Sequence, residues 1–192
     1  MNHKTNIALW LTVSRFALFP LAVISLASDW NNGGLISAVI TQIAGLTDFA
    51  DGIVARKTGQ TTQLGVNLDF FSDKIFIGGM LVTLALLGLI SVFVPVVVLA
   101  RELAVTVLRY SRFHWNPPSA DIWGKAKTMV SFGAIEWVAM NRDLSSGGLV
   151  TTFSSHLKLE GILSLAPWLV YAAVALTVIS GLNYFRRFGL KI

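Results

Sequence analysis

Long apolar runs alternate with short polar turns along the whole chain. A helix needs about 20 mostly apolar residues to cross the hydrocarbon core of a bilayer. The sequence holds six runs of about that length, separated by Asn-, Gly-, Ser- or Pro-containing turns and by charged residues. This pattern predicts an all-α integral membrane protein with six transmembrane helices, at residues 7–27, 35–56, 67–89, 92–113, 122–140 and 162–185.

The six runs follow one another without an internal repeat, so residues 1–192 are predicted to form a single membrane domain. The first run is longer than the apolar core of a usual signal peptide and contains Arg15. It is therefore interpreted as a retained helix. The longest polar stretch, 141–160, is rich in Ser, Thr and Gly and is predicted to be a loop with room for a short surface helix.

Composition agrees with a bilayer protein. Of the 192 residues, 54% are hydrophobic and 13% are charged, whereas soluble domains carry roughly 25% charged residues. The chain has no cysteine, which excludes disulfides and cysteine-based zinc sites. The net charge of +5 could suggest a nucleic-acid partner, but the placement of the basic residues argues against one.

The Lys and Arg residues gather on one side of the predicted membrane. Such residues favour the cytoplasmic side, where they face an anionic lipid leaflet. With both termini in the cytoplasm, only Arg142 and Lys158 fall on the opposite side. The predicted protein is thus a multi-pass protein of the inner cell membrane with no nucleic-acid partner. The cytoplasmic set is Lys4, Arg56, Lys57, Arg109, Arg112, Lys125, Lys127, Arg186, Arg187 and Lys191.

Four aspartates lie near the cytoplasmic ends of two consecutive predicted helices. Asp48 and Asp51 are three residues apart, and Asp69 and Asp73 are four apart, so each pair shares one helix face. Charges at membrane depth are costly and usually functional. Four close carboxylates repel unless a cation neutralises them, and all-oxygen ligands suit Mg²⁺ or Mn²⁺. A two-metal site, which can clamp a phosphoryl group during displacement, is therefore expected.

The residues around the aspartates fit a phosphate-containing substrate. Gly52 allows a ligand to approach the backbone closely, and the Arg56 guanidinium can reach a phosphate near the interface. Gly65 is expected just before the third helix, where it also allows close approach.

Residues 48–73 match every fixed position of a known signature, D-x2-D-G-x2-A-R-x8-G-x3-D-x3-D. On this match the chain resembles the CDP-alcohol phosphatidyltransferase family. Within it, the chain most resembles the members that make phosphatidylglycerol phosphate, through Asn6-Ile7, Thr12 and Arg15, through Ala100-Arg101-Glu102, Leu108-Arg109 and Gly124-Lys125-Ala126-Lys127-Thr128, and through the closing Ile179-Ser180-Gly181 and Tyr184-Phe185. Ala8 and Phe70 stand where those members usually have proline.

The resemblance implies a metal-dependent enzyme that transfers the phosphatidyl group of CDP-diacylglycerol to sn-glycerol 3-phosphate, releasing CMP, and that forms a homodimer. Asp48, Asp51, Asp69 and Asp73 would bind Mg²⁺ or Mn²⁺, with Asp73 also the general base. The CDP moiety would lie against Thr12, Asp51, Gly52, Arg56 and Gly65. The acceptor's phosphate would lie against Arg101, Arg109 and Lys125.

Other interpretations stay open from sequence alone. The acceptor could instead be inositol phosphate, or phosphatidylglycerol as in the related cardiolipin synthases. An intramembrane prenyltransferase also uses aspartate-rich helices and magnesium, and a cation carrier could line its path with aspartates. Arg101 and Glu102 could simply form an ion pair that ties helices together, and Lys127 could be a cytoplasmic anchor.

Overall fold

The computed structural model describes residues 7–58, 63–113, 122–158 and 160–188, and every regular element within these ranges is helical. The predicted all-α fold class is confirmed for this part of the chain. The elements are α1 (Ile7–Ala27), α2 (Gly33–Thr58), α3 (Gln63–Leu86), α4 (Phe93–Phe113), α5 (Ile122–Arg142), the 3-10 turn η1 (Asp143–Ser145), α6 (Leu149–Leu157), α7 (Glu160–Leu163) and α8 (Ala166–Phe188).

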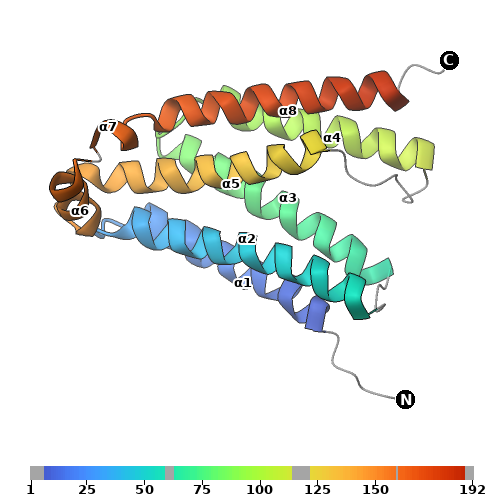
Figure 1. Ribbon diagram of the computed structural model, residues 1–192, viewed down its shortest axis with the longest axis horizontal. Helices are drawn as coiled ribbons and strands as arrows, with labels where there is room; N and C mark the ends of the chain where they lie inside the picture. Colours follow the sequence, from blue (N-terminus) through green and yellow to red (C-terminus); the bar gives the residue numbers. More distant parts are fainter. Residues whose placement is uncertain (1–6, 59–62, 114–121, 159, 189–192) are drawn as a thin grey trace.

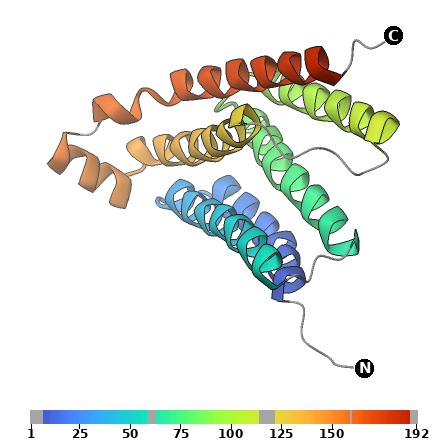
Figure 2. The ribbon, with the colours of Figure 1, turned by 45° about the vertical axis from the view of Figure 1, so that its right-hand side comes forward.

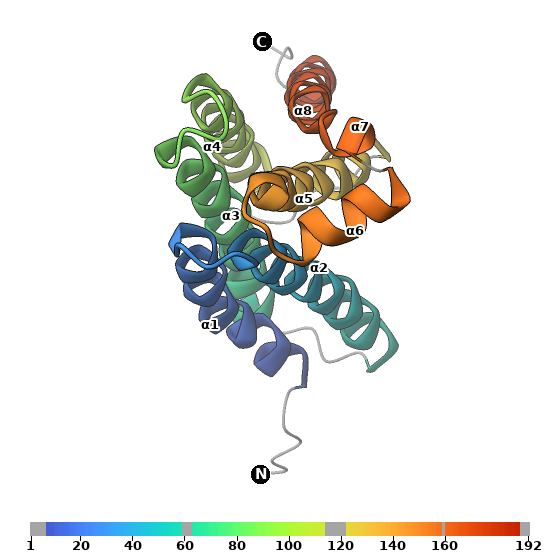
Figure 3. The same ribbon diagram turned by 90° about the vertical axis from the view of Figure 1, so that its left-hand side faces the viewer.

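The long helices α1 to α5 and α8 run back and forth along one axis (Figure 1). Viewed from the end, α1 and α2 form one side, α4 and α8 form the other, and α3 and α5 lie between them (Figure 3). The same two sides spread apart in the turned view of Figure 2. α6 and α7 cover one end of the bundle, while α2 ends and α3 begins at the other end (Figure 1).

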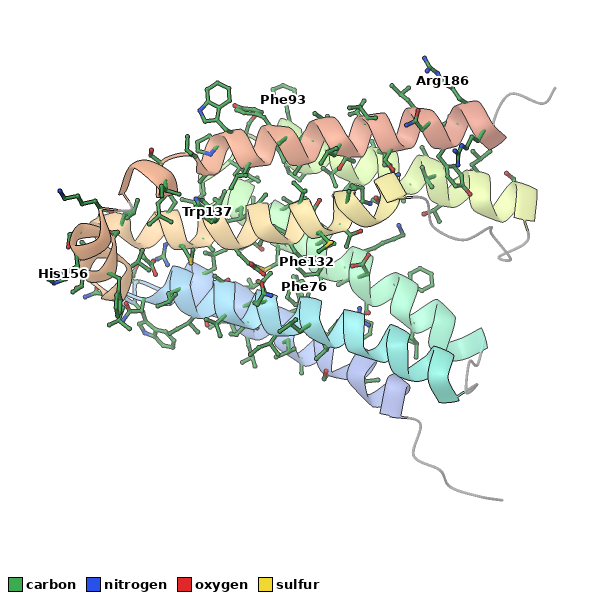
Figure 4. All side chains as sticks on the ribbon, in the orientation of Figure 1. Phe76, Phe93, Phe132, Trp137, His156 and Arg186 are labelled. Atoms are coloured by element: carbon green, nitrogen blue, oxygen red, sulfur yellow. The ribbon has the colours of Figure 1, made fainter. Side chains whose placement is uncertain are left out.

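An aromatic group fills the centre of the bundle. The Phe76 ring stacks on Phe132 with centroids 6.1 Å apart and meets Phe19 edge-on at 5.9 Å. Figure 4 shows Phe76 and Phe132 side by side between the helices. Fully buried aliphatic side chains, such as Leu84 and Ile135, extend this core along α3 and α5.

The outer surface of the bundle is unusually apolar. Leu86 is 83% exposed and Phe93 79% exposed, and Met129 and Trp168 are also largely exposed. Figure 4 shows Phe93 pointing away from the bundle. Exposed apolar side chains on so many helices suit contact with lipid tails. Among the described residues, the stretch 161–187 is long and apolar enough by itself to cross a membrane, and Val13–Ala27 and Gly33–Thr47 are shorter apolar helical stretches.

The covered end of the bundle is held by one buried carboxylate. Asp143 is 1% exposed, and its Oδ1 and Oδ2 accept hydrogen bonds from the backbone N–H groups of Gly34 at 3.1 Å and Leu35 at 2.9 Å. These are N–H groups of the first turn of α2, which have no partner within the helix. A Cβ at Gly34 would lie 1.9 Å from the Ala139 carbonyl oxygen, so only glycine lets α2 approach α5 this closely. Asp143 therefore caps α2 from 108 residues away.

Two sequence expectations change in the structure. Gly65 was expected before the third helix, but α3 begins at Gln63 and includes it. Glycine destabilises a helix most in its middle, through its conformational entropy, and Gly65 lies in the first turn of α3. The stretch 141–160 was expected to be a loop, but α5 continues to Arg142, and η1 and α6 follow. There the Leu149 N–H donates to the Asn32 Oδ1 at 2.6 Å, which gives α6 a defined start.

Candidate active site

The four aspartates lie on α2 and α3 toward the end of the bundle where these helices meet. Asp48 and Asp51 fall in the last three turns of α2, and Asp69 and Asp73 fall in the second to fourth turns of α3. Only the segment 59–62 joins the two helices, so their ends are at most about 18 Å apart. Both ends lie together in Figure 1. The side chains of Asp48, Asp51 and Asp69 lie outside the described part of the structure.

Asp73 is the aspartate whose side chain the structure describes. It lines a small pocket between three helices, together with Lys74 of α3, Glu102 of α4, and Lys127 and Ser131 of α5. Its Oδ1 is withdrawn from solvent. The pocket therefore places a candidate metal ligand and general base next to basic side chains.

Glu102 is the centre of the charged groups in this pocket. Its Oε2 accepts a hydrogen bond from Lys74, and its Oε1 accepts one from Lys127 and another from Arg101 at 2.8 Å. The Glu102 side chain is only 16% exposed, and that of Lys127 only 13%. Together with Asp73, the lining of the pocket holds two acidic and two basic side chains, so its charges are balanced.

Arg101 also ties two helices together. Its Nη2 donates to the Ser180 Oγ of α8 at 2.9 Å while its Nη1 donates to Glu102. A Cβ at Gly181 would lie 2.9 Å from the Arg101 Cγ, so glycine makes the room for this side chain against α8. The described contacts of Arg101 are those of the ion-pair interpretation, and its predicted contact with the acceptor's phosphate stays a prediction.

The other predicted ligands are placed only by their helices. Arg56 lies in the last turn of α2, Arg109 in the last turns of α4, and Lys125 in the first turn of α5. These three positions belong to helix ends on the side where α2 meets α3 (Figure 1). Thr12 lies in α1 and Gly52 in α2, one residue after Asp51. The side chains of Arg56, Arg109, Lys125 and Thr12 lie outside the described residues, so their roles stay predictions.

Sequence reasoning missed Lys74 and gave Lys127 a peripheral role. Both line the pocket and bond Glu102. The available signal was charge within an apolar segment, because such a side chain needs an oppositely charged partner. Lys74 directly follows Asp73, and Glu102 lies inside the fourth apolar run.

The donor set fits a divalent cation. Four carboxylates at the meeting point of α2 and α3 offer only oxygen ligands, which Mg²⁺ and Mn²⁺ prefer. Asp73 presents a carboxylate oxygen that is shielded from water. Within the described side chains no group of three or more His, Cys, Asp or Glu residues comes together, and the metal site stays a prediction.

Comparison with known proteins decides the family. The family model described as CDP-alcohol phosphatidyltransferase matches residues 5–179. The chain belongs to the CDP-alcohol phosphatidyltransferase family.

Three relatives illustrate the likeness to members of this family. A protein of Mycobacterium tuberculosis named as a probable phosphatidylglycerophosphate synthase is 34% identical over 185 residues, which cover 95% of this chain and 81% of the relative. A Haemophilus influenzae protein named CDP-diacylglycerol–glycerol-3-phosphate 3-phosphatidyltransferase is 30% identical, over 95% of this chain and 93% of its own. A Bacillus subtilis protein of the same name is 30% identical over 92% of each chain.

Proposed function

We propose that this member of the family transfers the phosphatidyl group from CDP-diacylglycerol to sn-glycerol 3-phosphate, giving phosphatidylglycerol phosphate and CMP. The observation that carries the proposal is the complete signature of residues 48–73, located where α2 meets α3. The names of the relatives, which specify this donor and this acceptor, support it.

The proposed location is the inner cell membrane, with six spans formed by α1 to α5 and α8 and both termini in the cytoplasm. Support comes from the apolar outer surface and from the basic residues at one end of the bundle. Arg186 and Arg187 lie in the last turn of α8, on the same side as Arg56. The lipid tails of the donor would stay in the bilayer while its CDP group and the acceptor enter from water. A homodimer is proposed from the family resemblance.

Two Mg²⁺ or Mn²⁺ ions held by Asp48, Asp51, Asp69 and Asp73 would neutralise the pyrophosphate and stabilise the departing CMP. Asp73 is the proposed general base. It accepts the proton of the glycerol 1-hydroxyl as that oxygen forms a bond to the β-phosphorus of CDP-diacylglycerol. The bond from this phosphorus to the oxygen of CMP breaks at the same time, and CMP leaves with the electron pair.

The remaining residues of the site bind and orient the two substrates. Gly52 and Gly65 would leave room for CDP close to the helix backbones, with Thr12 and Arg56 as polar contacts. The basic residues at the helix ends near the aspartates support an acceptor that carries a phosphate. Arg109 and Lys125, near the helix ends, are the proposed direct ligands of that phosphate, and Arg101 completes the basic wall. A neutral alcohol such as serine would leave this charge unused.

The test is CMP release from CDP-diacylglycerol by the purified protein in detergent with Mg²⁺. Glycerol 3-phosphate, inositol 1-phosphate, phosphatidylglycerol, serine and no acceptor are compared. We expect release with glycerol 3-phosphate alone and a loss of at least about 10²-fold in Asp73→Asn, since general bases contribute on that order. Asp29→Asn, which changes an exposed aspartate at the opposite end, serves as the matched control.

Each contrary result has a defined meaning. Release with a different acceptor would replace glycerol 3-phosphate in the proposal while keeping the donor. Release from Asp73→Asn at the rate of Asp29→Asn would reject Asp73 as the base. If folded protein released no CMP with any acceptor, the proposed function would be wrong.

A further inference from the structure

The short helix α6 has three distinct sides. Val150 and Ser154 are buried against the rest of the protein. Leu149 and Phe153 lie next to this buried side, one helical turn apart, yet they are 51% and 61% exposed. The remaining side carries the exposed polar residues Thr152, Ser155 and His156. A helix lying between protein and water needs only a buried side and a polar side, so the exposed apolar pair points to a third environment.

Hydrogen bonds fix the orientation of α6 on the bundle. The Leu149 N–H donates to the Asn32 Oδ1 at 2.6 Å, which ties the start of the helix to the turn between α1 and α2. One turn of the helix is tied to η1 as well, because the Thr151 Oγ1 donates to the carbonyl oxygen of Asp143 at 2.9 Å. The exposure of Leu149 and Phe153 is therefore set by the fold.

The position of α6 matches the surface of a bilayer. α5 has 21 residues and is therefore about 31 Å long, close to the hydrocarbon core of roughly 30 Å. Residues 143–148 join the end of α5 to α6. With α5 spanning the membrane as proposed, α6 begins at the boundary between hydrocarbon and water. Figure 3 looks along the long helices and shows α6 from its side, so α6 runs parallel to this boundary.

Exposed tryptophans mark the same boundary. Trp30 lies in the turn between α1 and α2, and Trp168 lies in the first turn of α8. Both side chains are largely exposed, and both segments belong to the end of the bundle that α6 covers (Figure 1). Tryptophan is enriched where hydrocarbon meets the lipid headgroups. Phe153 is thus an exposed aromatic side chain at the end where two others indicate the headgroup region.

We propose that α6 is an interfacial helix, with Leu149 and Phe153 inserted among the lipids of the outer leaflet and its polar side facing the water outside. The inference rests on the proposed function, because it takes the six proposed spans and their orientation. Helices of this kind bury their apolar side about 5–10 Å into the boundary between headgroups and acyl chains. Lys158, an exposed cation at the C-terminal end of α6, suits the phosphates of the same lipids.

The experiment uses the absence of cysteine from the natural chain. Single cysteines are introduced into the full-length protein, spin-labelled and reconstituted in vesicles of phosphatidylethanolamine and phosphatidylglycerol. Electron paramagnetic resonance then measures how often each label collides with O₂, which concentrates in hydrocarbon, and with a water-soluble nickel chelate. Leu149→Cys and Phe153→Cys probe the apolar pair, and Thr152→Cys and Ser155→Cys are matched controls on the same helix. Val178→Cys, at an exposed position near the middle of α8, is the lipid reference.

The ratio of O₂ to nickel collisions is expected to follow the sides of α6. It should be low at Thr152→Cys and Ser155→Cys, highest at Val178→Cys, and intermediate at Leu149→Cys and Phe153→Cys, since α6 lies at the boundary and not at the centre of the bilayer. All four labelled positions of α6 are exposed, so the label displaces no core side chain. Where one labelled variant is not monodisperse, the other residue of the same side gives the comparison.

Three results would overturn the inference. Equal ratios at the four positions of α6 would place the whole helix in one environment, either water or lipid. Infrequent collisions with both reagents at Leu149→Cys and Phe153→Cys would show that protein covers the apolar pair. A low ratio at Val178→Cys would reject the proposed spans and the inference with them, whereas a high ratio there with no contrast along α6 would reject the inference alone.

Discussion

Replacing Asp143 by alanine removes the cap that α5 and η1 provide for α2. The two carboxylate oxygens accept the N–H groups of Gly34 and Leu35 at 3.1 and 2.9 Å, and the side chain is 1% exposed. Loss of a helix cap costs about 0.5–2 kcal/mol, and hydrogen bonds to a charged group contribute about 1.5–3 kcal/mol each. Because removing the aspartate also removes its own burial cost, we expect Asp143→Ala to destabilise the protein by about 2 kcal/mol.

The assay is thermal unfolding of the purified protein in detergent, followed by the loss of monodisperse protein after heating. A protein of this size shifts its Tm by about 2–4 °C per kcal/mol, so Asp143→Ala should unfold about 4–8 °C lower. Asp29→Ala is the control, since Asp29 is an exposed aspartate at the same end of the bundle and should leave Tm unchanged. Asp143→Asn should fall between them, because its amide can accept one of the two N–H groups.

The outcome also bears on the site at the opposite end of α2. The helix that Asp143 caps is the one that carries Asp48 and Asp51. A Tm for Asp143→Ala that matches Asp29→Ala would refute the claim that this carboxylate stabilises the start of α2. An unchanged Tm with lost CMP release would instead give Asp143 a functional role that the cap does not explain.

Two further predictions concern packing, with Tm measured in the same way. Gly181→Val should lower Tm by the equivalent of about 1–3 kcal/mol, because its Cβ would lie 2.9 Å from the Arg101 Cγ and push Arg101 off Ser180; an unchanged Tm would show that Arg101 has room to move. Phe76→Ala should cost about 3–5 kcal/mol of folding stability, since it leaves a cavity where Phe76 stacks on Phe132. Phe71→Ala, at a half-exposed position of α3, should cost far less. Equal decreases in Tm for the two variants would contradict the assigned core.

Most helix positions could be predicted because each apolar run has bilayer length and ends at polar residues. The helix predicted at 122–140 is observed as Ile122–Arg142, and the helix predicted at 92–113 is observed as Phe93–Phe113. The prediction failed where hydropathy was a poor guide to helix formation. Gly65 lies inside α3 despite its low helix propensity. α6 forms within a polar stretch because one of its faces is buried against the rest of the protein. Val150 and Ser154 lie on that face.

The aspartate cluster was visible in the sequence because its members lie in two local pairs, and periods of three and four residues define a helix face directly. The partners of Glu102 were not visible in this way. Lys74 lies 28 residues before it, and Lys127 lies 25 residues after it. Arg101, which also donates to Glu102, donates a second hydrogen bond to Ser180 of α8. These contacts depend on how three or four helices are aligned along their lengths, which no local pattern specifies.

Charged residues in an apolar bundle nevertheless narrow the search for such contacts. Each one requires a partner of opposite sign, because an unpaired charge away from water is too costly to retain. The sequence thus indicates that Glu102 and Asp143 must have partners. In the structure Glu102 pairs with Lys127, and Asp143 lies 3.6 Å from the Arg142 Nη1 while it accepts the backbone N–H groups of α2. The two acids differ in their other contacts: Asp143 also binds backbone groups of α2, whereas Glu102 binds side chains of α3, α4 and α5. Substitution of Asp143 is therefore expected to weaken the start of α2, whereas substitution of Glu102 would remove the carboxylate that joins α3, α4 and α5.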